Sequence, residues 1–367
     1  MEIDILKSVR STFKDRRVLL TGHTGFKGSW FSMLLHNLGA KADGFALDPP
    51  TSPSLFDLAC CSDFINDFRG DITDFGQVKK QIAQSKPEIV FHFAAQSLVR
   101  LSYDCPHDTF MTNVVGTLNV LEAVKQCPHV KAIVVITSDK VYENKNWIYS
   151  YRECDRIGGH DPYSGSKASA EIMTSVYQRS FFGTEASPTC ASCRAGNVIG
   201  GGDYSKDRLI PDIFRAFAAG EKIKIRNPDH VRPWQHVLEP LFGYLLLGSK
   251  LLSSEGEKYS GAWNFGPSQK SFLRVSEVAD ECSRILGGTV WCHEPTKDDY
   301  VETEILHLCS EKALFGLKWR SQWNIDETLA RTVNWYRLLM KGEPARDLCL
   351  RDINDYFQIL CKKGISP

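Results

Sequence analysis

The sequence predicts an α/β fold: a doubly wound, parallel Rossmann-type sheet followed by a smaller, mixed C-terminal domain. Short apolar runs alternate with longer helical patterns through the first half of the 367 residues. These runs are continuously apolar, as expected for strands buried on both faces of a parallel sheet. A glycine-rich turn also joins the first predicted strand to the first predicted helix, which is typical of nucleotide-binding sheets.

The elements of the first half can be placed in order. The first strand is predicted at 17–21 and the first helix at 28–38, where Gly39 ends it. A helix with a 3.6-residue apolar spacing is predicted at 109–126. The remaining predictions are strands at 41–47, 89–93, 131–137 and 188–194, and a helix at 164–182.

From about residue 200 the pattern loosens into loops rich in Gly, Asp, Arg and Pro. We expect a Rossmann domain over 1–199, with a later segment at about 230–265 interleaved, and a second domain mainly over 200–367. The last stretch, 347–367, is predicted to be a polar helix. Other helices are predicted at 210–219, 275–286 and 325–341.

Composition and charge exclude several classes of protein. The 44 basic and 44 acidic side chains give a formal net charge of zero, without a basic block, so nucleic acid is not expected as a partner. No apolar run reaches the roughly 18 residues of a membrane span, and the N-terminus lacks a signal-peptide pattern. The 12 cysteines lack metal-ligand spacing. We therefore expect reduced thiols, no metal site and a cytoplasmic location.

The glycine-rich turn is a candidate dinucleotide site. Its glycines permit a tight turn, and the N-terminus of the following helix offers N–H groups to a pyrophosphate. Asp48 follows Gly28 by about 20 residues, where a carboxylate would bind the ribose of adenosine. The candidate residues of the turn are Gly22, His23, Thr24, Gly25, Phe26, Lys27 and Gly28.

NAD is the expected cofactor, but two features keep NADP open. Pro49 and Pro50 stiffen the loop directly after Asp48. His23 and Lys27 add cationic groups to the glycine-rich turn, and either could meet a phosphate.

Two further segments are expected at the cofactor. Asp71 and Ile72 offer a polar and then an apolar side chain, which suits the edge and the face of an adenine. Alternatively, Asp71 helps to cap the next helix through Thr73 or Asp74. The strand predicted at 89–93 ends in small residues that leave room for a ribose and a nicotinamide. That end consists of Phe93, Ala94, Ala95 and Gln96.

Tyr163 and Lys167 are the first candidates for chemistry. They lie one helical turn apart, so both face the same way. An ammonium beside a phenol, together with a positive nicotinamide ring, lowers the pKa of the tyrosine. Tyr163 can then act as a general base toward a substrate hydroxyl. Ser138, at the end of the strand predicted at 131–137, adds a hydroxyl to the same sheet edge.

Together, the glycine turn, Asp71, Ala94-Ala95, Ser138 and the Tyr163/Lys167 pair resemble the extended short-chain dehydrogenase/reductase family over nearly the whole chain. Six longer stretches, in the same order, resemble the members of that family that dehydrate CDP-glucose. They cover 21–30, 49–56, 137–144, 159–164, 208–212 and 232–237.

This resemblance implies a redox-neutral loss of water from a nucleotide sugar, using NAD. Tyr163 would take the C4 hydroxyl proton while the C4 hydride passes to the nicotinamide. The resulting ketone acidifies the C5 proton, which a base removes while an acid protonates the departing C6 hydroxyl. The hydride then returns to C6, and the product is a 4-keto-6-deoxy nucleotide sugar.

The three residues 138–140 differ from related dehydratases, which carry Thr-Asp-Glu where this chain has Ser-Asp-Lys. The resemblance makes Ser138 a partner of the C4 oxygen and Asp139 the acid for water loss. Lys140 would take the place of the carboxylate base. An amine acts as a base only when it is neutral, so its pKa must fall from about 10.4. Alternatively, a charged Lys140 stabilises the enolate oxygen.

The resemblance also implies residues for the nucleotide sugar. Asn197 matches a position that contacts the phosphates or the sugar, and Arg208 and Arg232 offer forked donors for a diphosphate. His236 is expected to position Arg232. Each of the four could instead be a structural or surface residue, and no residue is assigned to the cytosine.

Two other classes of function share parts of this pattern. The enzyme alternatives are a 4,6-dehydratase of a GDP-, dTDP- or UDP-hexose and a nucleotide-sugar 4-epimerase, which would not need Asp139 and Lys140. A cofactor-sensing binding protein would not need the Tyr163/Lys167 pair. In the family, helices at 109–126 and 164–182 pair across a two-fold axis, so we expect a homodimer. A dimer of dimers stays open.

Overall fold

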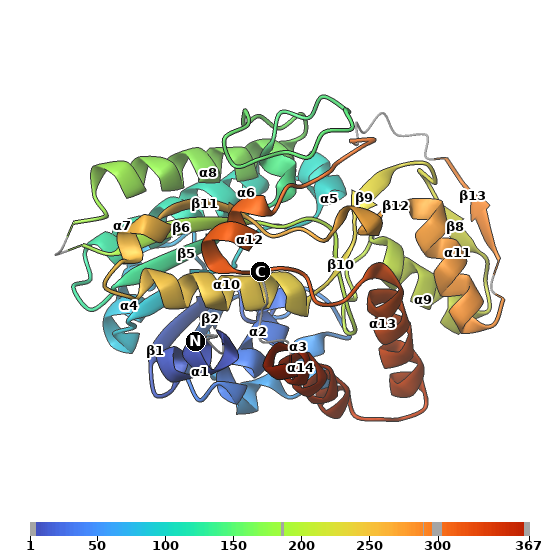
Figure 1. The fold of residues 1–367 in the computed structure, drawn as a ribbon, viewed down its shortest axis with the longest axis horizontal. Helices are drawn as coiled ribbons and strands as arrows, with labels where there is room; N and C mark the ends of the chain where they lie inside the picture. The colour runs from blue at the N-terminus through green and yellow to red at the C-terminus, as the bar shows by residue number, and fades with distance from the viewer. Residues whose placement is uncertain (1–4, 185–186, 289, 296–302, 363–367) are drawn as a thin grey trace.

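The computed structural model describes residues 5–184, 187–288, 290–295 and 303–362. Within them, a seven-stranded sheet lies at the centre of the molecule (Figure 1). Its strands follow the order β3-β2-β1-β4-β5-β6-β11. Every neighbouring pair is parallel, so the predicted doubly wound sheet is confirmed. The strands are β1 (Arg17–Thr21), β2 (Lys41–Ala46), β3 (Asn66–Arg69), β4 (Ile89–His92), β5 (Ala132–Ile136), β6 (Thr189–Arg194) and β11 (Gly261–Asn264).

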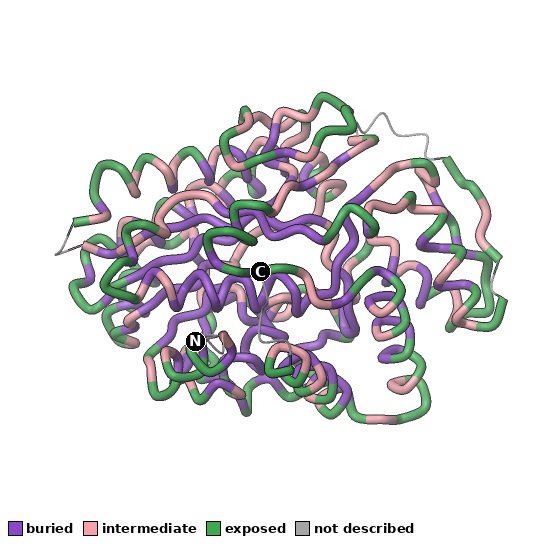
Figure 2. Tube along the Cα trace, in the orientation of Figure 1, coloured by how far each residue is buried: buried purple, intermediate pink, exposed green. Residues whose placement is uncertain are grey.

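Helices cover both faces of the sheet. Alternate strand residues point to opposite faces: Leu20 and Phe91 join one apolar cluster, whereas Leu19 and Val90 join the other. Figure 2 shows the strands and the helix across the middle of the molecule as mostly buried. One face packs against α1 (Ile5–Phe13), α2 (Phe26–Asn37) and α10 (Leu238–Leu251), and the other against α4 (Phe75–Ser85), α7 (Gly116–Lys125) and α8 (Pro162–Ser180).

The helix predicted at 109–126 is interrupted. α6 (Pro106–Phe110) runs into a π-helical turn, Met111–Val115, before α7 begins. Asn113 lies in that turn, where its side-chain Oδ1 accepts from the Gln96 N–H at 2.8 Å and its Nδ2 donates to the Gln96 carbonyl at 2.9 Å. Insertions of this kind are frequent near functional sites, and this one fixes the loop after β4.

The second half builds a smaller region beside the carboxyl edge of the sheet and returns to the sheet through α10 and β11 (Figure 1). Its strands form three pairs: β7 (Val198–Ile199) with β10 (Gln235–His236), β8 (Ile223–Ile225) with β13 (Trp291–His293), and β9 (Val231–Pro233) with β12 (Phe272–Arg274). The helices of this half include α9 (Leu209–Ala219), α11 (Val275–Leu286), α12 (Glu311–Leu317) and α13 (Ile325–Met340). The first half has two further short helices, α3 (Leu55–Leu58) and α5 (Val99–Asp104).

The predicted last helix is present as α14 (Ala345–Lys362), but it is amphipathic rather than polar on all sides. It buries Leu348, Ile353 and Tyr356 against α1, α2 and α13, and the Tyr356 hydroxyl donates to Glu239 on α10 at 2.8 Å. The rest of the predicted helix, 363–367, lies outside the described residues. None of the helices described here is long and apolar enough to cross a bilayer.

Candidate active site

The glycine-rich turn lies where the sheet order reverses. β1 has β2 on one side and β4 on the other, so the chain leaves β1 and β4 in opposite directions and opens a crevice between them. Gly22 has φ +76°, and a Cβ there would lie 2.6 Å from the Ala94 backbone nitrogen. A Cβ at Gly28 would lie 2.1 Å from the Gly22 carbonyl oxygen. Both positions therefore require glycine.

A cavity of about 1470 Å³ opens at this crevice and runs from Asp48 to Tyr163. A long crevice between a helix N-terminus and a carboxylate at the end of β2 suits a dinucleotide, with the carboxylate at the ribose end. The predicted cofactor residues that line it are Gly22, Thr24, Gly25, Phe26, Lys27, Gly28, Asp48, Asp71, Ile72, Phe93, Ala94, Ala95, Gln96, Tyr163 and Lys167.

Asp71 makes a local turn at the rim of this cavity. Its Oδ1 accepts from the Thr73 N–H at 2.8 Å. The cap of α4 is Asp74, whose carboxylate accepts from the Gln77 N–H at 3.0 Å. The capping role that was open to Asp71 is therefore filled by Asp74.

His23 faces away from the cavity, contrary to the prediction that it could meet a phosphate. Its ring is fully buried under Gly44, where an added Cβ would lie 2.4 Å from the ring, and its Nε2 lies 2.8 Å from Asp67 Oδ1. Burial lowers the pKa of His23, although Asp67 opposes this effect. A neutral, buried imidazole behind the turn is a packing group rather than a phosphate ligand.

A second, smaller cavity of about 280 Å³ adjoins the first and shares residues with it, including Lys27, Ser138, Tyr163 and Arg208. Seven Lys or Arg side chains and four Asp side chains line it among the described residues. The whole chain, in contrast, has a formal net charge of zero. This excess of cations makes the smaller cavity suited to an anionic ligand.

Lys27 lies where the two cavities meet. Burial and the neighbouring charge of Arg208 lower the pKa of Lys27 to about 8, while Asp139 and Asp203 act in the opposite direction. Lys27, one of the two predicted cationic groups of the glycine turn, thus lies at the end of the crevice that holds Ser138 and Tyr163.

Residues 138–140 form a tight turn directly after β5. The Ser138 Oγ accepts from the Lys140 N–H at 3.2 Å and donates to Asp139 Oδ1 at 3.2 Å. Asp139 is buried, and its Oδ2 has no hydrogen-bond partner in the described part of the chain. Burial raises the pKa of Asp139, although the charge of Lys140 and the bond from Ser138 lower it. This carboxyl group therefore keeps a proton to higher pH than an exposed aspartate would.

Tyr163 and Lys167 lie at the start of α8, beside this turn. Burial raises the pKa of Tyr163 to about 12, while hydrogen bonding to Ser138 lowers it. Burial and the charge of Lys27 lower the pKa of Lys167 to about 7, and Lys167 Nζ donates to the Ile136 carbonyl at 3.2 Å. Burial of the phenol therefore outweighs the lowering of its pKa by Ser138 and Arg208, and the expected low pKa of Tyr163 is not found.

The predicted substrate residues Asn197, Arg208 and Arg232 all line the smaller cavity. Arg208 donates to Asp203 at 2.8 Å and to the Ser97 hydroxyl at 3.1 Å. Arg232, on β9, donates to the Val231 and Glu304 carbonyls at 2.9 and 3.0 Å.

His236 does not position Arg232, contrary to the prediction. His236 is fully buried on β10, where its ring packs against Trp30 and Trp323, and its Nδ1 accepts from the Leu238 N–H at 3.3 Å. Burial lowers the pKa of His236 to about 3. The histidine beside Arg232 is His230, whose Nδ1 lies 3.1 Å from a guanidinium nitrogen.

The sequence interpretation missed several charged residues around the site. Asp207 Oδ1 lies 2.6 Å from Arg226 NH1 and 3.5 Å from Arg100 Nε, and all three line the smaller cavity. Glu171 and Arg194 form a buried ion pair behind the residues 138–140. Glu171 carried a usable signal, because an acid four residues after Lys167 shares its helical face. Arg100 and Arg226 come from distant segments and carried none.

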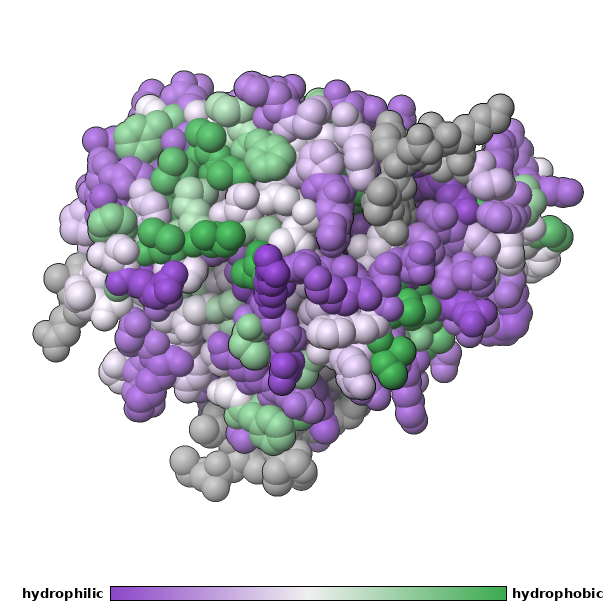
Figure 3. Space-filling model, turned by 90° about the horizontal axis from the view of Figure 1, so that it is seen from above, coloured by the Kyte–Doolittle hydropathy of each residue, from purple (hydrophilic) through white to green (hydrophobic). Residues whose placement is uncertain are grey.

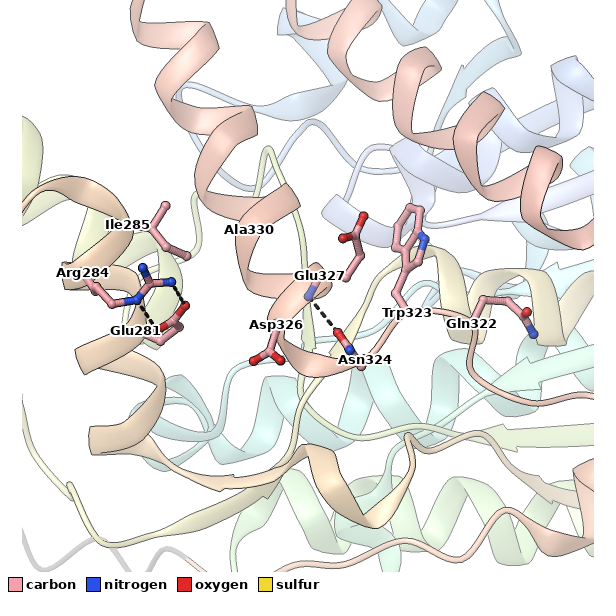
Figure 4. Close-up of a pocket in the computed structure, with 9 residues that line it drawn as sticks. All are labelled: Glu281, Arg284, Ile285, Gln322, Trp323, Asn324, Asp326, Glu327 and Ala330. Carbon is pink, nitrogen blue, oxygen red and sulfur yellow. Dashed lines mark hydrogen bonds and ion pairs between the residues drawn. The ribbon is translucent and has the colours of Figure 1, made fainter.

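A third pocket, between α11 and α13, is separate from these cavities (Figure 4). Its charged groups bond to close neighbours: Arg284 donates to Glu281 at 2.8 Å, and Asn324 accepts from the Glu327 N–H at 2.9 Å. These bonds stabilise the two helices, and the pocket brings together no set of groups that would carry out chemistry.

Comparison with known proteins agrees with this geometry. The profile of the GDP-mannose 4,6 dehydratase family matches residues 19–332. The CDP-glucose 4,6-dehydratase of Salmonella typhimurium strain LT2 is 46% identical over 352 residues, which cover 95% of this chain and 98% of that protein. The dTDP-glucose 4,6-dehydratase of Mycobacterium tuberculosis strain H37Rv is 32% identical over 257 residues, which cover 66% and 73%.

Two solved structures share the fold. An epimerase from Methanothermobacter thermautotrophicus has a TM-score of 0.77 at 23% identity and covers 92% of this chain and 96% of its own. The dTDP-glucose 4,6-dehydratase from Bacillus anthracis, solved in complex with NAD, has a TM-score of 0.72 at 23% identity and covers 89% and 98%. At these identities the likeness concerns the fold alone.

Proposed function

Since the chain belongs to the GDP-mannose 4,6 dehydratase family, we propose that it is a hydro-lyase that converts CDP-glucose into CDP-4-keto-6-deoxy-glucose. The substrate comes from the relative that is 46% identical over almost the full length of both chains. One observation at the site carries the reaction type. A buried acid, Asp139, and an amine, Lys140, lie beside the Tyr163/Lys167 pair, which is the set of groups needed to oxidise one carbon and remove water from the next two.

NAD is the cofactor that this site supports best. The solved dehydratase from Bacillus anthracis contains NAD, and in this chain the large cavity has the matching turn, helix N-terminus and ribose-end carboxylate. Arg69 NH1 lies 3.7 Å from Asp48, where it could meet a 2′-phosphate, but Arg69 also donates to Asp67 at 2.7 Å. Because two carboxylates already neutralise Arg69, it is a poor partner for the 2′-phosphate of NADP, which favours NAD. The preference for NAD over NADP stays a prediction.

At C4, Tyr163 removes the hydroxyl proton and Ser138 hydrogen-bonds the same oxygen. NAD held by the glycine-rich turn and Asp48 would supply the acceptor for the C4 hydride and the hydride for C6, while a proton returns to C5. Because burial raises the pKa of Tyr163 to about 12, the phenol needs nearby positive charge to act as a base at neutral pH. Arg208 is one source, since its charge lowers the pKa of Tyr163.

Water loss uses the other two residues of the turn. Asp139 donates a proton to the departing C6 hydroxyl, consistent with its burial and raised pKa. Lys140 lines the same cavity and is the group that would remove the C5 proton. The alternative is that charged Lys140 stabilises the enolate oxygen while another group takes the proton.

The diphosphate of the substrate would bind among the cations of the smaller cavity. Arg208 and Arg232 supply planar, forked donors, and Asn197 supplies an amide at the same cavity. Arg226 and Arg100, which face Asp207 in this structure, add two further guanidinium groups at the same cavity.

A homodimer is proposed through the helices predicted at 109–126 and 164–182, the second of which is α8 in the structure. Exposed apolar side chains gather there, and Figure 3 shows a hydrophobic area over α8 on this face of the molecule. An uncovered apolar patch of this kind marks an interaction surface. The residues are Leu101, Phe110, Leu118, Ile172, Val176 and Phe181. The dimer of dimers and the cytoplasmic location stay predictions.

Product analysis with a panel of substrates tests the function. The protein is incubated with NAD and, separately, with CDP-, dTDP-, GDP- and UDP-glucose and with GDP-mannose, and the products are identified by mass and NMR. A 4-keto-6-deoxy product from CDP-glucose alone is expected. Turnover of a different nucleotide sugar would overturn the substrate, and an epimerised hexose without loss of water would overturn the reaction type.

A further inference from the structure

A buried ion pair lies behind the catalytic turn, defined here as residues 138–141. Arg194, at the end of β6, donates through one terminal nitrogen to Glu171 Oε2 at 2.7 Å, and the two side chains are 3% and 2% exposed. Neither is among the described residues that line the two cavities. The pair therefore reaches the chemistry only through the residues that it contacts.

The glutamate end of the pair holds the start of the catalytic turn. The Glu171 carboxylate accepts from the Thr137 hydroxyl and, at 2.8 Å, from the Ser192 hydroxyl. Thr137 directly precedes Ser138. Glu171 itself lies on α8, one turn beyond Lys167 and two turns beyond Tyr163, on the same face of that helix.

The arginine end of the pair holds the other side of the turn. A terminal nitrogen of Arg194 donates to the Tyr142 hydroxyl at 2.9 Å, and the guanidinium lies 5.0 Å from the centre of the same ring. Tyr142 directly follows Val141, the last residue of the turn. The Tyr142 hydroxyl in turn donates to Asn264 on β11 at 2.7 Å.

We propose that Glu171 and Arg194 are positioning residues, which hold the catalytic turn at both ends and set its distance from Tyr163 and Lys167 on α8. The inference rests on the proposed function. Replacing a buried ion pair with apolar residues of similar volume is often neutral or stabilising, so general stability is a weak reason for this pair. A proton donor and a base that act on neighbouring carbons of one sugar, in contrast, require a geometry held to within a fraction of an ångström.

Two hydroxyls on the same carboxylate provide a matched test. Thr137→Val and Ser192→Ala each remove one hydrogen bond to Glu171, and Thr137→Val also removes the 3.2 Å bond to the Cys193 carbonyl. Only Thr137 adjoins the catalytic turn. We expect kcat to fall about tenfold to a hundredfold in Thr137→Val, with KM and the dissociation constant for NAD unchanged. Ser192→Ala should keep the normal kcat, and Thr137→Ser, which retains the hydroxyl, should restore it. Equal losses of kcat in Thr137→Val and Ser192→Ala would overturn the inference.

Two further measurements separate this inference from the substrate assignment. If the unmodified enzyme acts on a nucleotide sugar other than CDP-glucose, the same variants are compared on that substrate. A crystal structure of Thr137→Val does not depend on turnover. The catalytic turn should shift relative to Tyr163, whereas an unmoved turn together with a lowered kcat would show that the pair does not position it.

Discussion

Asp139 and Gly196 touch so closely that a side chain at position 196 would displace the carboxylate. A Cβ on Gly196 would lie 2.2 Å from Asp139 Oδ2 and 2.7 Å from Pro233 Cγ. The same Oδ2 atom has no hydrogen-bond partner in the described part of the chain. The bare backbone of Gly196 thus leaves room for the proposed acid at the edge of the substrate cavity.

Gly196→Ala should therefore damage catalysis. The added methyl group would push the Asp139 carboxylate or Pro233 aside, and a displacement near 1 Å lowers kcat by about a hundredfold. Steady-state kinetics with CDP-glucose would measure this. Gly158→Ala is the control, because its Cβ would meet Glu143 at an ordinary 3.4 Å, and it should keep kcat within about twofold. A Gly196→Ala enzyme with normal kcat would contradict the claim that the bare backbone at position 196 keeps Asp139 in place.

Substitution of Lys140 separates its two proposed roles. If Lys140 is the base, Lys140→Ala should still oxidise C4, giving reduced nicotinamide in a single turnover, but should not exchange the C5 proton with D₂O. Lys140→Glu should recover part of that exchange, because a carboxylate is the base that related dehydratases carry. Normal exchange in Lys140→Ala would instead assign Lys140 to stabilisation of the enolate.

The sequence was sufficient for five of the seven strands of the sheet and for much of the site, because these follow local patterns. The strands at the two edges of the sheet, β3 and β11, were not predicted. Continuous apolar runs predict buried parallel strands, and the glycine turn, the catalytic turn and Tyr163/Lys167 each occupy one short segment. His23 could not be placed in this way. Its environment is set by Asp67 on β3 and by the flat backbone of Gly44, and neither neighbour is visible from the turn itself.

Stability should fall in mild acid because of buried neutral histidines. Burial lowers the pKa of His236 from 6.5 to about 3. As the pH falls below 6.5, the unfolded chain takes up a proton that the folded chain cannot, so folding weakens. One such histidine costs about 2 to 3 kcal/mol over two pH units. His92 should act in the same way, since burial lowers its pKa to about 3.

His236→Asn tests this linkage while keeping an acceptor for the Leu238 N–H. Urea unfolding at about pH 7 and about pH 5 should show a smaller loss of stability in the variant than in the unmodified protein. The difference corresponds to one proton fewer taken up on unfolding. The variant is expected to be less stable overall at both pH values. An identical pH dependence in the two proteins would exclude His236 as a buried neutral group.

Charge placed on α8 should break the proposed dimer. Ile172 and Val176 are exposed apolar residues one turn apart on this helix, so the double variant Ile172→Glu/Val176→Glu would bury two carboxylates in the interface. Light scattering at micromolar concentration should give a dimer for the unmodified protein and a monomer for the variant. Phe315→Glu is the control. It replaces an apolar residue on α12 that is more exposed than Ile172, and this variant should stay dimeric. A monomeric unmodified protein would contradict the proposal.

The errors in the sequence interpretation have a common physical origin. His236 was paired with Arg232 because the two lie close in sequence, but β10 turns the imidazole into the core and leaves His230 beside the guanidinium. The polar appearance of α14 hid an apolar face that becomes clear only when α1 and α13 pack against it. Tertiary packing decides which way such side chains face, and local sequence patterns carry no information about that packing.

Isotope tracing tests the central claim most directly, because it follows the hydride and the C5 proton in one experiment. CDP-glucose carrying deuterium at C4 is turned over in ordinary water, and the unlabelled substrate is turned over in D₂O. The account predicts that the C4 deuterium appears at C6 of a 4-keto-6-deoxy product, and that D₂O supplies deuterium at C5. Return of the deuterium to C4 of an epimerised hexose, with no solvent deuterium at C5, would contradict it.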